Sequence, residues 1–229
     1  MGAYDDTVPG PVGWTTENAR ERAHDVADTL LAQARESLSV GDTEGATQRF
    51  LRAASLFSAQ GLSGDAEAAR LAAVAALMNH DPRRADELWQ DLASIGDSSG
   101  AGAARRGLLG ARLSRSLGER AEALERLDMA RRGALEGRDA IHYLDAVSQA
   151  AAVHVERGEH AQAYEMLAMG WTTLAHLVGR DAAARWVRPL MLELRAGLGD
   201  EAFRRARAEC ERAWQGPPSP VDSLRGPLL

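Results

Sequence analysis

A Gly-acidic pair recurs at nearly equal intervals along this 229-residue chain, and this spacing constrains the fold more than any other feature. The pairs are Gly41-Asp42, Gly118-Glu119 and Gly158-Glu159, and His80-Asp81 takes the same place in the second copy, so the copies start 39, 38 and 40 residues apart. Each corner is followed by a small residue, then a large one, then a small residue or leucine, at offsets of five, nine and twelve. These positions are Ala46, Phe50 and Ala53; Ala85, Trp89 and Leu92; Ala123, Leu127 and Ala130; and Ala163, Leu167 and Gly170.

A second series of glycines lies between these corners, at Gly61, Gly96, Gly137 and Gly179. Glycine suits the left-handed position that ends a helix, and the aspartates two residues after Gly137 and Gly179 suit the N-cap of the next helix. Asp81 followed by Pro82 is a further helix start. The chain is therefore predicted to alternate two kinds of corner with two helices per repeat, each of about 15–20 residues. A weaker fifth corner is expected near Gly197, followed by Ala202 and Ala206.

The composition favours an all-α protein. The apolar residues are mostly alanine and leucine, which are good helix formers, and isoleucine occurs only at Ile95 and Ile141. All 27 basic residues are arginine, which excludes a P-loop and Schiff-base catalysis because both need a lysine. The net charge of −6 disfavours nonspecific binding to nucleic acid, which needs a basic surface.

The corner, the alanine five residues later, the large residue and the small residue after it resemble the tetratricopeptide repeat. The resemblance covers about residues 16–214. It departs from the family in its period, because the standard repeat has about 34 residues, and in its first helix, where alanine fills the small-residue site. Those alanines are Ala34, Ala73, Ala111 and Ala151. The resemblance implies a right-handed α-solenoid of about five helical hairpins over residues 15–214, between Pro/Gly-rich segments at 1–14 and 215–229 that we expect to be disordered.

The resemblance also implies a concave groove lined by the first helix of each repeat. Offsets from each corner place Arg35, Arg70, Arg105, Arg112 and Arg115 in this groove, with Leu31, Leu77 and Leu108 in an apolar strip. An arginine-lined groove would hold an acidic segment or a carboxylate through bidentate pairs. In the fourth and fifth repeats the same offsets give mainly apolar or small residues. These are Asp145, Ser148, Ala152, Val155, Ala184, Val187, Met191 and Leu194.

We therefore expect a non-catalytic scaffold or adaptor that binds a peptide or protein segment, with no cofactor and no metal. Two alternatives remain: a self-assembling structural component that stacks through the ends of the array, and a regulatory module that senses a small ligand. An enzyme is a weaker alternative. Gly96-Asp97-Ser98-Ser99-Gly100 has the spacing of a nucleophile elbow, but a helical pattern precedes it where that chemistry needs a strand.

The histidines and the cysteine fit structural roles better than chemical ones. His142, His154, His160 and His176 have no spacing that suits a zinc site on one helix face. Cys210 has Glu209 and Glu211 beside it, which raise a thiol pKa, and it lies on one stripe of the last helix with Phe203, Ala206 and Trp214. A single cysteine, no signal-peptide pattern and no long apolar run lead us to expect a cytoplasmic protein.

Overall fold

The computed structural model describes residues 16–95 and 100–213, and in these ranges the chain forms helices and no strands. The predicted all-α class is confirmed. The ten helices of the described ranges are α1 Thr16–Ser39, α2 Thr43–Ala59, α3 Ser63–Leu77, α4 Pro82–Ile95, α5 Gly100–Ser116, α6 Arg120–Glu136, α7 Ala140–Glu156, α8 His160–Val178, α9 Arg180–Leu198 and α10 Asp200–Ala213.

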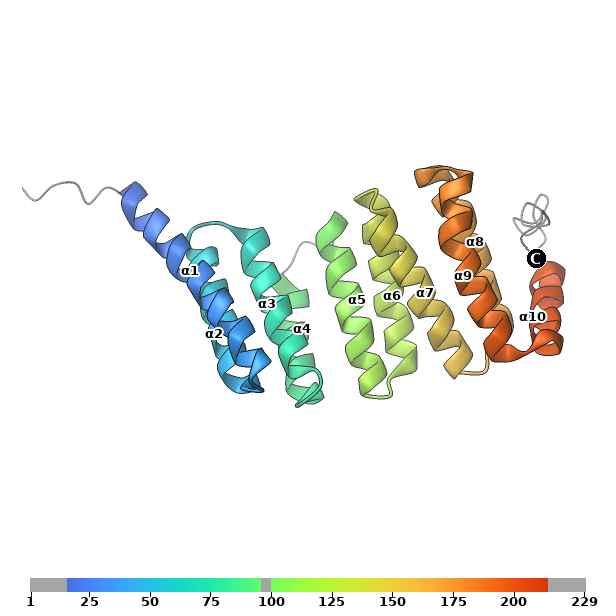
Figure 1. The fold of residues 1–229 in the computed structure, drawn as a ribbon, viewed down its shortest axis with the longest axis horizontal. Coiled ribbons are helices and arrows are strands. Elements are labelled where there is room, and N and C mark those ends of the chain that lie inside the picture. Colours follow the sequence, from blue (N-terminus) through green and yellow to red (C-terminus); the bar gives the residue numbers. More distant parts are fainter. Residues whose placement is uncertain (1–15, 96–99, 214–229) are drawn as a thin grey trace, which may run out of the picture. The chain divides into compact units, whose positions relative to one another are not determined.

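The helices form two compact units, which divide between Leu77 and Met78. In the first unit α1 packs on α2 and α2 packs on α3. In the second unit each helix from α4 to α10 packs on the next, and further contacts join α5 to α7 and α7 to α9. In Figure 1, α5, α7 and α9 follow one another on the side toward the viewer, with α6 and α8 behind them. One continuous domain over residues 15–214, its handedness and its grouping into five hairpins stay predictions.

The corners are turns, as their sequence predicts. Gly41, Gly118 and Gly158 have φ between 75° and 81°, a left-handed conformation that a Cβ disfavours. The small and large residues that follow the corners are buried in all four copies, and alanine at the first-helix site is buried as well. The repeat pattern therefore marks the packing ridge of each second helix and the small positions against which it packs.

Three predicted helix boundaries differ from the structure. Gly137 has a φ of −77°, and Arg138 takes the left-handed conformation instead, with a φ of 52°. Asp181 lies inside the first turn of α9, because Gly179 alone links α8 to α9 with φ 86° and ψ 156°. The fifth corner likewise falls at Gly199, so Gly197 belongs to helix α9.

The N-caps at Asp81 and Asp139 are confirmed. Asp81 Oδ1 accepts a hydrogen bond from the Arg84 N–H at 3.1 Å. Asp139 Oδ1 accepts hydrogen bonds from the N–H groups of Ile141 and His142, and its Oδ2 lies 2.5 Å from His142 Nδ1. Burial raises the pKa of Asp139, but the hydrogen bonds from His142 and Ile141 and the charge of His142 outweigh it, so the pKa lies below its ordinary value.

Helices α5 and α6 approach each other closely at glycines. A Cβ on Gly107 would lie 2.5 Å from the carbonyl oxygen of Arg126, and a Cβ on Gly133 would lie 2.7 Å from the carbonyl oxygen of Gly100. Arg126 is 4% exposed and joins three helices: its Nη1 donates to Asp86 Oδ1 of α4 and to the Gly110 carbonyl of α5. Its guanidinium carbon lies 3.8 Å from the centroid of the Trp89 ring.

Replacing Asp139 with alanine tests the cap at α7. We expect a loss of about 1 kcal/mol in the free energy of unfolding at pH 7, since two backbone N–H groups lose their acceptor. The pKa of Asp139 is depressed in the folded state, so its contribution is present above its unfolded-state pKa and disappears as pH falls through the folded-state pKa. Urea denaturation at several pH values measures this.

The matched control is Glu119→Ala, because Glu119 occupies the N-cap of α6 without making a side-chain cap hydrogen bond. A loss of the same size in both variants, or a loss at Asp139 that stays constant down to about pH 2, would contradict the assignment.

A second prediction compares two helical glycines. Gly107→Ala should lower the free energy of unfolding by about 1–3 kcal/mol, because the new Cβ meets backbone atoms of α6 that cannot move away alone. Gly197→Ala should raise it by about 0.5–1 kcal/mol, because a Cβ there meets no atom within 4 Å and alanine favours the helix. Chemical denaturation of both variants measures the difference, and a Gly107→Ala protein as stable as the wild type would show that the helices are less closely packed.

Candidate binding site between α7 and α9

A cavity of about 380 Å³ opens between α7 and α9, in the second unit. Its size lies at the lower end of the range for ligand sites. Helix α8 contributes Leu167 to it, and the other lining residues come from α7 and α9. They are Ser148, Ala151, Ala152, Val155 and Glu156 on α7, and Leu190, Glu193, Leu194, Gly197 and Leu198 on α9.

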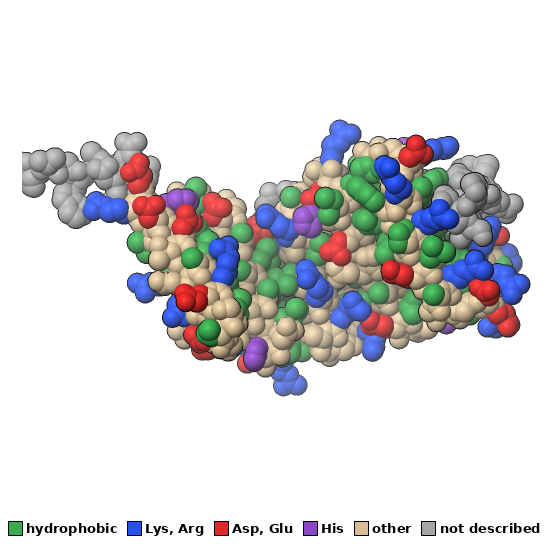
Figure 2. All heavy atoms as spheres, in the orientation of Figure 1, with side chains coloured by type: hydrophobic (Ala, Val, Ile, Leu, Met, Phe, Trp, Pro, Cys, Tyr) green, Lys and Arg blue, Asp and Glu red, His purple; other side chains and the backbone are tan. Residues whose placement is uncertain are grey.

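The cavity exists because small residues stand where two helices pass each other. Ala151 and Ala152 line it from α7, and Gly197 lines it from α9. A Cβ at Gly197 would have no atom within 4 Å, so this glycine leaves open space and does not serve close packing. Its aliphatic lining can remove an apolar side chain from water, which stabilises binding in proportion to the area buried. Figure 2 shows hydrophobic side chains between charged ones over this side of the second unit.

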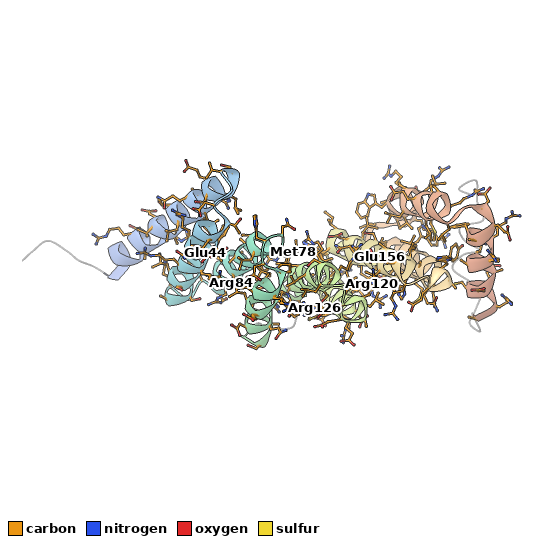
Figure 3. All side chains as sticks on the ribbon, turned by 90° about the horizontal axis from the view of Figure 1, so that it is seen from below. Glu44, Met78, Arg84, Arg120, Arg126 and Glu156 are labelled. Carbon is orange, nitrogen blue, oxygen red and sulfur yellow. The ribbon has the colours of Figure 1, made fainter. Side chains whose placement is uncertain are left out.

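Glu156 and Glu193 are the charged residues that line the cavity. Glu156 is held by two arginines: Arg115 of α5 donates from Nη2 to its Oε1, and Arg120 Nε lies 3.4 Å from its Oε2. Figure 3 labels Arg120 and Glu156, which lie close together. Glu193 is exposed and has no ion-pair or hydrogen-bond partner among the described residues. Glu156 therefore has two cationic partners, and Glu193 has none among the described residues.

Four of the groove positions expected from corner offsets line this cavity, namely Ser148, Ala152, Val155 and Leu194. Val187 and Met191, expected on the same face, are buried in the core. Sequence reasoning missed Glu193 and Gly197. The signal available for Gly197 was a glycine inside a long helix, but this glycine was interpreted as the fifth corner.

The five arginines expected in the groove belong to two different units. Arg35 and Arg70 belong to the first unit, where Arg35 is exposed and Arg70 Nη2 donates to Ser58 Oγ at 3.0 Å. In the second unit Arg105 and Arg112 are exposed on α5, and Arg112 Nε donates weakly to the Leu108 carbonyl at 3.4 Å. Arg115 is engaged with Glu156.

Leu77 and Leu108 are each 2% exposed. The structure corrects their expected place in an apolar surface strip, because both side chains are buried. The corner offsets predicted that both side chains face the groove, and their burial shows that they do not.

A second hollow, of about 490 Å³, lies along α6 beside Trp89. Arg126 is one of its lining residues, and its guanidinium is already bonded to Asp86, Gly110 and Glu122. Arg126 is labelled in Figure 3. Since these contacts hold α4 to α5 and α6, we assign this hollow to the architecture and not to ligand binding.

The other candidate residues have structural partners or fall outside the described ranges. His142 contacts Asp139, and His154 Nδ1 lies 2.8 Å from Glu159 Oε2, so both histidines lie at corners. Cys210 is buried, and this burial, together with Glu165 and Glu211, raises the pKa of its thiol. Within residues 16–95 and 100–213 there is no group of three or more potential metal ligands and no helix that could span a membrane.

Ser98 and Trp214 lie outside the described residues, as do the segments 1–14 and 215–229. The other members of the predicted last-helix stripe, Phe203, Ala206 and Cys210, are buried, and the Phe203 ring meets that of Tyr164 edge-on with centroids 5.4 Å apart.

No family model, curated protein or solved structure matches the chain. The resemblance to the tetratricopeptide repeat therefore stays a prediction.

Proposed function

We propose that this protein is a non-catalytic binding scaffold whose groove between α7 and α9 takes apolar side chains of a peptide or protein segment. The observation that carries this proposal is the aliphatic cavity itself, at positions where the repeat pattern expects a groove. We also propose that the helices build a right-handed solenoid of tetratricopeptide type, supported by the 38–40-residue period and by the contacts of α7 with both α5 and α9.

The lining supports binding of a side chain that belongs to a longer segment. Seven of its members are alanine, valine or leucine, and all but Leu167 of its lining residues come from α7 and α9. A segment lying in such a groove would place one or two anchor side chains in the cavity and leave the rest of its length on the helices beside it. Burial of one leucine-sized anchor contributes about 1.5–3 kcal/mol, which suits a reversible partner.

Filling the cavity from within tests this function. Gly197→Trp should abolish partner binding, with a loss of affinity of at least tenfold, or about 1.4 kcal/mol. Gly197→Ala is the matched control, because it adds a Cβ into open space and leaves most of the cavity free. The wild type and both variants are immobilised, exposed to lysate of the source organism, and the retained proteins are identified by mass spectrometry.

A protein retained by the wild type and by Gly197→Ala, and lost with Gly197→Trp, is the expected result. Retention of the same proteins by all three would place partner binding elsewhere on the molecule. Helical circular dichroism and the unfolding midpoint of Gly197→Trp verify that the variant is folded.

A further inference from the structure

The two carboxylates that line the α7–α9 groove differ in their ion-pair partners. Glu156 lies between Arg115 and Arg120, so its carboxylate already has two cationic partners. Glu193 lines the same cavity from α9 and has no such partner among the described residues. An exposed carboxylate beside an aliphatic surface is therefore available to a cation that a partner brings.

We propose that the segment bound in the groove carries an arginine or lysine within one helical turn of its apolar anchor, and that this cation pairs with Glu193. The proposal rests on the binding function proposed above and states the chemistry of the partner. It reverses the charge expected from the sequence, where the arginines suggested an acidic segment.

The geometry of α9 sets how far the cation of the bound segment lies from its apolar anchor. Glu193 is four residues before Gly197 and three after Leu190, so all three lie on one face of the helix, within about two turns. An anchor side chain beside Gly197 would therefore have its neighbouring residues next to Glu193.

The aliphatic surroundings of Glu193 strengthen its preference for a cationic residue of the partner. Once an anchor covers Leu190 and Leu194, water is displaced near Glu193 and the local dielectric constant falls, so an ion pair there is stronger than one in open solvent. An acidic partner residue at the same place would meet like charge without compensation, which disfavours it. Glu193 thus acts as a specificity residue, while the cavity supplies the burial of the anchor.

A random 12-residue peptide library displayed on phage and selected on the full chain tests the proposal. We expect the wild type and Gly197→Ala to enrich peptides with leucine, isoleucine, methionine or phenylalanine next to arginine or lysine. Glu193→Arg should enrich the same apolar residues next to aspartate or glutamate. A labelled peptide from the wild-type selection should bind Glu193→Arg at least tenfold more weakly in fluorescence anisotropy, and its charge-reversed copy should recover the affinity.

The outcomes separate this proposal from the function on which it rests. Apolar peptides without a charge preference, lost with Gly197→Trp, would overturn the cationic partner and leave the groove as a binding site. Enrichment that survives Gly197→Trp, or no enrichment, would overturn both. Enrichment that appears only after Leu224→Asp and Leu228→Asp would assign the groove to the chain's own Leu224-Arg225-Gly226-Pro227-Leu228-Leu229 segment, and so overturn a separate partner.

Discussion

The second unit depends on how closely α5 and α6 approach each other. A Cβ at Gly107 would meet the carbonyl oxygen of Arg126, so glycine sets the distance between the two helices. That distance lets the Arg126 guanidinium reach the Gly110 carbonyl of α5 and Asp86 of α4 at once, and stack over Trp89. The packing of α4 on α5 and α6 therefore depends on Gly107 of α5, which has no side chain.

Arginine supplies several of the links between helices because its planar group donates in more than one direction. Arg126 contacts three helices, and Arg115 and Arg120 bring α5 and α6 to Glu156 at the end of α7. A lysine has a single ammonium group and could not bridge these partners in the same way. Arginines that hold helices together in this way are not available to a ligand.

The corners could be predicted from the sequence because a left-handed turn such as that at Gly118 strongly favours one residue type. Arg138 could not, since its left-handed conformation depends on the helices it joins and not on a local signal. The offset rule predicts the groove face of α7 well, as Ala152 shows. It fails at Leu108, because a rotation of one residue moves a side chain from the groove into the core. The cavity itself could not be predicted, since it depends on which small residues of two helices come to face the same space.

Gly197 gives this groove an evolutionary freedom that the packed glycines lack. Substitutions at Gly107 are limited by the neighbouring backbone, whereas the space beside Gly197 is open and its backbone is helical. Glycine there costs the helix about 0.5–1 kcal/mol relative to alanine, so selection for stability alone would replace it. Single substitutions at this position can change the depth of the groove without rebuilding the helices. If the groove binds a partner as proposed, a lineage of such proteins can exchange one partner for another while keeping its fold.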